Sequence, residues 1–226
     1  MKYRILCVAL MAHIVAGSCL AAGEDWQYWS DHKIAWKMTD NTAWVLAPGA
    51  RYSDDMSETF YNWIALNHVH KWGKGWSSIV ALQADELKNS SGRTDNQYGI
   101  LGAVYSCKAC DLNQLWSETC KFRVQGRVFY RLDGSGGDTE FDMFRPRVFI
   151  SEKLGPITAT LSDELRFDMT HSESRESMYK NRVFLTGSKK ISKNISVIIG
   201  LVRESNHKNN SWTHANGMIT KLVVTL

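Results

Sequence analysis

Proline is scarce in this sequence, and charges of the two signs are nearly balanced. The 226 residues include 3 prolines and 16 glycines, a composition with no sign of a disordered or low-complexity linker. The formal net charge is +4, and removing Lys2 and Arg4 with the leader described below leaves +2. So small a positive excess argues against a nucleic-acid-binding protein, and no nucleic-acid partner is expected.

Long apolar runs are also lacking, except at the start of the chain. A positively charged start precedes the apolar run Ile5–Ala16, and Cys19-Leu20-Ala21 or Leu20-Ala21-Ala22 then offers a cleavage site. This pattern predicts a secretory signal peptide over 1–22, which leaves a single domain over 23–226. A lipidated Cys19 is the alternative interpretation of the same leader. The run is too short for a transmembrane helix, which needs about 20 apolar residues, and no later segment is apolar enough.

Cysteine is limited to three residues after the leader: Cys107, Cys110 and Cys120. An oxidising compartment would allow one disulfide among them and leave one thiol over. The spacing of Cys107 and Cys110 is shared by zinc and redox sites, but a second ligand pair and an α/β redox unit are both missing. We therefore predict a structural disulfide that joins Cys107 or Cys110 to Cys120, with idle thiols or redox chemistry as the alternatives.

What the sequence does contain is regular alternation, and Cys120–Leu132 has it most clearly. One set of alternate residues is uncharged, and the other, which includes Arg123, Arg127 and Arg131, is mostly basic. A period of two predicts a β-strand with one apolar and one charged face. Its length suits a tilted transmembrane strand of about 9–11 residues, and the cationic row should face a lumen because it could not face lipid.

Similar segments recur along the chain without a convincing helix between them. About eleven β segments are predicted, at 26–38, 42–53, 60–69, 75–87, 97–106, 120–132, 141–154, 157–170, 177–190, 195–204 and 212–226. Except for 107–117, their connections alternate between short turns and longer polar loops, which is typical of outer-membrane barrels. The predicted fold is all-β, an antiparallel up-and-down transmembrane β-barrel of about 10–12 strands. We expect an even number, about 10 or 12, because single-chain bacterial barrels are usually even-numbered.

Two residues interrupt the alternation of the predicted strands. Pro48 cannot donate a ladder hydrogen bond, which predicts a bulge or irregular pairing. Asp163 interrupts an apolar row, which predicts either a bulge or a costly exposure.

Tryptophan is abundant, with nine residues. Most of them lie near the ends of predicted strands, which favours aromatic girdles at a bilayer interface over packing in a core.

Rows of charge on neighbouring strands give the strongest candidate site. It consists of Arg123, Arg127, Arg131, Arg145, Arg147, Glu164, Arg166, Asp168, Lys180 and Arg182. In a meander these rows lie side by side and face inward. They predict an anion-preferring pore or a site for acidic solutes or lipid headgroups. The alternative is a salt-bridged network that fills a narrow lumen, and we expect a lumen that is plugged or nearly plugged.

No pattern makes a convincing catalytic or metal site. His68 and His70 share one face of a strand, but no third ligand is spaced to complete a metal site. Ser205-Asn206-His207 has the residue types of barrel lipases, but its order and spacing do not match those enzymes. The sequence therefore predicts no catalytic residue, no cofactor and no metal.

Several short motifs spread over the chain carry a resemblance to a known family. They are Trp26 with Trp29, Arg51-Tyr52-Ser53-Asp54-Asp55, Arg145-Pro146-Arg147, Ser162-Asp163-Glu164, and Asn181-Arg182 followed by Lys193-Asn194. On these motifs the chain resembles the domain-of-unknown-function 2490 family of bacterial outer-membrane-type β-barrels, which has no settled activity. The segment Cys107–Cys120 and the final Leu226, where such barrels usually end in Phe, depart from this pattern. The resemblance implies a fold and a location but no catalytic residue.

The sequence as a whole predicts an integral protein of the bacterial outer membrane, with a structural role or a narrow channel with a basic lumen. One alternative is an outer-membrane enzyme acting on lipid or envelope glycan. Another is a soluble periplasmic barrel that binds an apolar ligand, with its apolar face turned inward. The expected partners are outer-membrane lipid and the barrel-assembly machinery. The machinery would recognise the last strand, where Met218, Thr220, Leu222, Val224 and Leu226 should face lipid.

Overall fold

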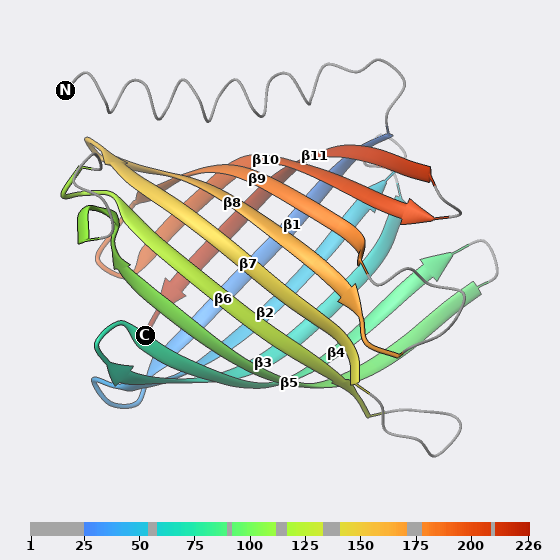
Figure 1. Cartoon of the computed structure of the whole chain (residues 1–226), viewed down its shortest axis with the longest axis horizontal. Helices are drawn as coiled ribbons and strands as arrows, with labels where there is room; N and C mark the ends of the chain where they lie inside the picture. Colours follow the sequence, from blue (N-terminus) through green and yellow to red (C-terminus); the bar gives the residue numbers. More distant parts are fainter. Residues whose placement is uncertain are drawn as a thin grey trace.

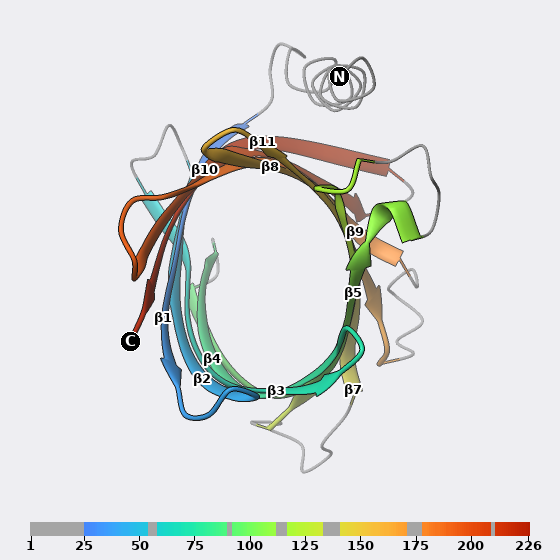
Figure 2. The same ribbon diagram turned by 90° about the vertical axis from the view of Figure 1, so that its left-hand side faces the viewer.

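The computed structural model describes residues 25–53, 58–89, 92–111, 117–132, 141–170, 178–208 and 211–226. Eleven β-strands within these residues close into a barrel (Figures 1 and 2). They are β1 (Asp25–Lys37), β2 (Thr42–Ser53), β3 (Glu58–Gly73), β4 (Trp76–Asn89), β5 (Gly92–Lys108), β6 (Lys121–Arg131), β7 (Phe141–Leu154), β8 (Ile157–Asp168), β9 (Met178–Lys190), β10 (Ile195–Lys208) and β11 (Ser211–Thr225). The short 3-10 helix η1 (Ala109–Asp111) follows β5. No helix in the described ranges has the length and hydrophobicity to cross a membrane. The predicted signal peptide lies outside the described residues.

The all-β barrel is confirmed, but the expectation of an even strand number is wrong. Consecutive strands pair antiparallel, and the ring closes between β1 and β11, which run parallel. Eleven residue pairs, from Asp25↔Ala215 to Ala35↔Thr225, form this seam. With an odd number of strands the first and last must run in the same direction.

The two ends of the barrel differ less in loop length than the sequence suggested. We call the end with connections 38–41, 74–75, 109–120, 155–156 and 191–194 the turn end, and the opposite end the loop end. Two predicted polar loops, 89–96 and 206–211, prove to be mostly strand, because β4 and β5 are separated by only 90–91 and β10 and β11 by only 209–210. Polar residues there pair across strands, as Arg93 does with Glu86 at 3.0 Å. Their polarity therefore indicates contact with water, not a loop.

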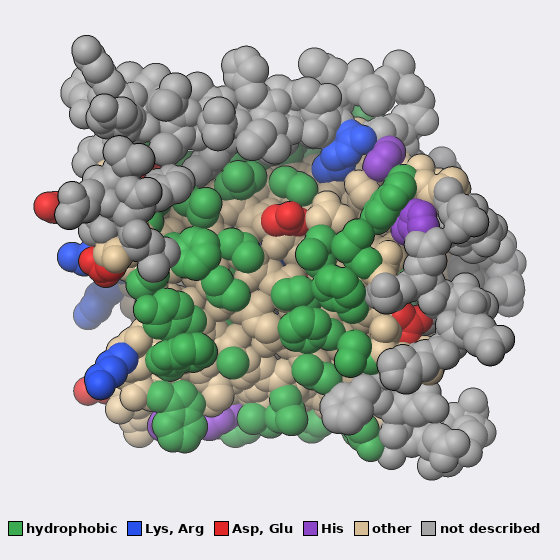
Figure 3. Space-filling view, in the orientation of Figure 1, with side chains coloured by type: hydrophobic (Ala, Val, Ile, Leu, Met, Phe, Trp, Pro, Cys, Tyr) green, Lys and Arg blue, Asp and Glu red, His purple; other side chains and the backbone are tan. Residues whose placement is uncertain are grey.

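Alternation sorts the side chains onto an apolar outside and a more polar inside. On β3 and β4, Ile64, Leu66, Val80 and Leu82 are exposed on the outer surface, while their sequence neighbours Ala65, Asn67, Ile79 and Ala81 are buried. Hydrophobic side chains dominate the outer face in Figure 3, and charged and histidine side chains lie mainly towards its ends. This arrangement is the reverse of the one that a soluble barrel with an apolar interior requires.

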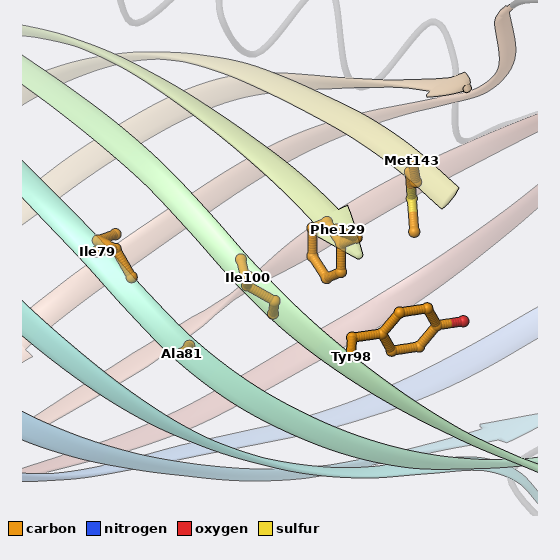
Figure 4. Packing of buried hydrophobic residues seen from close by; sticks show 6 residues of the cluster. All are labelled: Ile79, Ala81, Tyr98, Ile100, Phe129 and Met143. Carbon is orange, nitrogen blue, oxygen red and sulfur yellow. The ribbon is translucent and has the colours of Figure 1, made fainter. Parts of the chain in front are cut away.

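Part of the inner wall is nevertheless apolar. Six buried side chains from four consecutive strands pack together there: Ile79, Ala81, Tyr98, Ile100, Phe129 and Met143 (Figure 4). Tyr98 and Phe129 meet edge to face, with their ring centroids 5.8 Å apart. Strands β4 to β7 thus contribute an apolar patch to the inner wall, although β6 and β7 also carry inward arginines. The sequence pattern did not predict this patch.

The tryptophans divide between the outer surface and the interior. Trp36, Trp44, Trp72 and Trp76 lie on strand residues next to the turn end, and Trp26 and Trp212 lie near the loop end. Five of these six are exposed on the surface, Trp72 most strongly. This is the distribution expected of two aromatic girdles. Trp29 and Trp63 depart from it because both face inward and stack on Arg51. Trp116 lies outside the described residues.

Pro48 and Asp163, which interrupt the predicted alternation, differ in their effect on strand pairing. Pairing between β1 and β2 is interrupted beside Pro48, between Asp31↔Gly49 and Ile34↔Leu46, because proline lacks the amide hydrogen that a ladder bond needs. Asp163 keeps its register in both described pairings, so it is not in a bulge. It faces outward, where the amide of Asn181 donates a 2.6 Å hydrogen bond to it. Exposure, rather than a bulge, is therefore the correct alternative for Asp163.

The predicted cysteine pairing is narrowed to one possibility. Cys107 lies opposite Phe122 in the β5–β6 register, while the Cys120 carbonyl accepts a hydrogen bond from the Ala109 amide. The strand register therefore separates Cys107 from Cys120, and these two do not form a disulfide. The Cys110 side chain lies outside the described residues, so a Cys110–Cys120 bond stays a prediction.

Replacing Gly49 with Ala should destabilise the barrel by about 1–3 kcal/mol, the usual cost of overpacking. A Cβ at this position would overlap the indole of Trp63, which stacks on the Arg51 guanidinium. Gly99→Ala is the matched control, since its Cβ would meet its nearest atom, in Leu132, at 3.8 Å. Urea unfolding in detergent measures both variants. Equal stabilities would show that Trp63 moves aside at no cost.

Candidate functional site

Glu164 on β8 is the centre of the inward charge cluster. Strand register places it opposite Arg147 on β7 and Arg182 on β9. Four described arginines lie within ion-pair distance of its carboxylate: Arg145 at 2.8 Å, Arg166 at 3.3 Å, Arg182 at 3.4 Å and Arg147 at 3.7 Å. The rows predicted from alternate residues on β7, β8 and β9 therefore do converge on a single carboxylate.

A second carboxylate, Glu204 on β10, extends this cluster and was not predicted. It lies opposite Arg182 in the register, and it contacts Arg182 at 2.5 Å and Lys180 at 2.8 Å. Counting the described side chains in these contacts, five cations share two carboxylates. The cluster therefore carries an excess of three positive charges. The alternation of Val202, Glu204 and Asn206 on β10 was the signal that could have found Glu204.

Aromatic rings extend the cluster along the inner wall from β9 to β1 and β2. Arg182 lies over the ring of Trp29, 4.9 Å from its centroid, and Arg51 lies over the same ring at 4.0 Å. The Trp29 ring also meets Phe184 edge to face at 5.8 Å. Trp29 is on β1 and Phe184 on β9, which β10 and β11 separate in the ring. With Trp29 at 2% and Arg182 at 1% exposure, this layer narrows the loop-end half of the lumen.

The lumen is hollow nearer the turn end. Lys33 lies an even number of residues from the inward Trp29 on β1, and Arg123 an even number from the inward Phe129 on β6, so both face inward. Both side chains are nevertheless exposed to solvent. A side chain can be inside a closed barrel and still touch water only where the interior is open. The plugged or nearly plugged lumen stays a prediction for the loop-end layer, and the exposure of Lys33 and Arg123 argues against it in the turn-end half.

The remaining predicted cluster residues lie apart from Glu164. Arg131 is 3.5 Å from Asp142. Asp168 accepts hydrogen bonds from the backbone amide and the hydroxyl of Thr170 at the end of β8. The Arg127 guanidinium donates to the side-chain oxygen of Gln125 once that amide is oriented to accept. These residues face the same lumen as the cluster around Glu164.

The two candidate chemical sites do not assemble. His68 and His70 face outward, and each lies against an indole, Trp44 and Trp72 respectively. The described residues contain no group of three or more side chains able to hold a metal ion. His207 stacks on Trp212, while Ser205 bonds to Nδ1 of His214 at 2.9 Å. A hydrolase base also needs an orienting group, and the described contacts give His214 none.

Comparison with known proteins supports the fold alone. No family model matches the chain, and no curated protein matches it. Among solved structures, the chain is similar to a NanC porin solved in a rhombohedral crystal form, with a TM-score of 0.50 and 10% sequence identity over 90% of this chain and 100% of that one. The fold is a porin-like β-barrel. At this identity the similarity carries no residue or solute from the porin to this barrel.

Proposed function

We propose that the protein is an integral outer-membrane β-barrel and that its lumen is a narrow passage that prefers anions. The observation that carries this proposal is the charge excess inside the ring, where five cations share Glu164 and Glu204. Fixed positive charge in a confined aqueous space attracts anions and repels cations. The apolar outer face, the tryptophan bands and the porin-like fold support the location.

Reconstitution into planar lipid bilayers tests the passage. Under a KCl gradient the reversal potential should have the sign of chloride preference. Lys33→Gln, which removes an exposed inward cation, should shift that potential towards potassium. Lys74→Gln removes the same charge from the turn between β3 and β4 and should leave it unchanged. A cation-preferring current would contradict the proposal, and a barrel with no current would favour the purely structural role.

We also propose that the protein is related to the domain-of-unknown-function 2490 family. The barrel-assembly machinery would recognise its last strand. Met218, Leu222 and Leu226 are exposed on the outside of that strand, as lipid-facing residues should be. Their alternation with inward Ile219 and Lys221 supports a terminal strand of outer-membrane type.

The parallel seam predicts that the two ends of the barrel domain lie on opposite sides of the membrane. β11 ends at the turn end, and β1, which is parallel to it, must begin at the loop end. With loops facing outward, an epitope tag before Asp25 should bind antibody on intact cells. A tag after Leu226, or one inserted at Lys74, should bind only after permeabilisation. Labelling of both ends from the same side would contradict the parallel closure.

A further inference from the structure

Four inward cations form a second group on the turn-end side of the cluster around Glu164, and Arg127, which lies opposite Arg145 in the register, borders both groups. Lys33 and Lys221 come from the seam strands β1 and β11, and Arg123 and Arg127 come from β6. In the ring order β6 lies five strands from β1 through β2 and six through β11, so the two pairs belong to facing walls. Lys33 is nevertheless within electrostatic range of the other three. The group therefore spans the hollow half of the lumen.

Little negative charge balances this group. Lys221 pairs with Asp31 at 3.1 Å, and both side chains keep about a fifth of their surface exposed, at 19% and 22%. Among the described residues, no carboxylate lies within ion-pair distance of Lys33, Arg123 or Arg127. Glu164 is within electrostatic range of Arg127, but four other arginines already share it. Four cations with one carboxylate leave an excess of three positive charges.

The two arginines are held by neighbours that do not neutralise them. The Arg123 guanidinium lies 3.6 Å from the centroid of the Phe149 ring, and Arg127 donates to Gln125. Stacking fixes the plane of a guanidinium while leaving its N–H edge free to donate. Together with the exposed ammonium of Lys33, this arrangement presents charged donors to water from two sides of the lumen.

We propose that Lys33, Arg123, Arg127 and Lys221 form a binding site for a small multivalent anion with phosphate or carboxylate groups. The proposal rests on the outer-membrane barrel proposed above and adds a saturable site to its lumen. Guanidinium groups bind such oxyanions through two parallel hydrogen bonds. Like charges facing one another across a confined space favour an anion that can contact both walls. A monovalent ion such as chloride cannot do this as well.

Calorimetric titration of the detergent-solubilised, folded protein tests the site, with inorganic phosphate and citrate as probes at low salt. Wild type should bind at least one of them saturably. The double variant K33Q/R123Q should bind it about tenfold more weakly or not at all, since two charge-assisted contacts are lost. Lys74→Gln is the charge-matched control and should bind as wild type does. Arg127→Gln provides a second variant, expected to weaken binding with one substitution.

The outcomes separate this proposal from the proposed function. Saturable binding by wild type that is unchanged in K33Q/R123Q and in Arg127→Gln would overturn the site. So would a wild-type barrel that conducts chloride but binds neither probe saturably. Binding that is lost in the variants, in a barrel that does not conduct, would support the site and overturn the passage. A stronger response to phosphate or to citrate identifies which oxyanion the site prefers.

Discussion

Replacing Glu164 with Gln should lower the free energy of unfolding by about 3–5 kcal/mol, the usual result of removing one partner from a buried ionic group. The substitution keeps the size of the side chain but leaves Arg145, Arg147, Arg166 and Arg182 without the carboxylate that they share, and only Arg182 keeps an ion pair with Glu204. Only 7% of the Glu164 side chain is exposed, so water can compensate little of the lost charge.

Glu86→Gln is the control for this prediction. Glu86 also pairs with an arginine, Arg93, whose side chain is 73% exposed, and such pairs contribute about 0–1 kcal/mol. Chemical unfolding in detergent or lipid vesicles, followed by tryptophan fluorescence, measures both variants. Trp29 lies against Arg182 and should report the loss of the layer directly. A Glu164→Gln barrel as stable as the Glu86→Gln one would show that the cluster does not hold the walls together.

Exchanging the character of two adjacent residues on β6 should affect the stability of the barrel to very different extents. Val128→Arg would place a charge on the outer surface, at a cost of about 2–4 kcal/mol near the middle of a bilayer. Arg127→Val removes an inward cation that lies opposite Arg145 in the register, so it relieves repulsion and should cost little. The free energy of unfolding in lipid vesicles distinguishes the two. Similar losses in both variants would contradict the assignment of the faces.

Much of this arrangement could be predicted because strands have a period of two. The basic row of Arg123, Arg127 and Arg131 indicated which face of β6 lines the lumen, and the structure places it there. The same argument brought Arg145, Arg147 and Arg182 to Glu164, since adjacent strands in a meander align their inward rows. Local alternation was therefore enough to predict the barrel fold and the main ionic cluster.

Features that depend on partners far apart in the chain could not be predicted. The seam joins Asp25 to Ala215, and nothing in either segment specifies a parallel pairing. Trp29 was expected in a girdle, but it lies on the inner face, where it contacts Phe184 beyond β10 and β11. Lys33 and Lys221 join the candidate anion site only because the seam brings β1 and β11 next to each other.

Labelling at 127 and 128 tests the central claim, an outer-membrane barrel with an apolar outside and a cationic lumen, most directly. Arg127→Cys and Val128→Cys would be made separately, with Cys107, Cys110 and Cys120 replaced by serine. In lipid vesicles, a bilayer-embedded thiol probe should label position 128 and a water-soluble one position 127. Equal labelling of both positions by the embedded probe, or labelling of neither, would contradict the account.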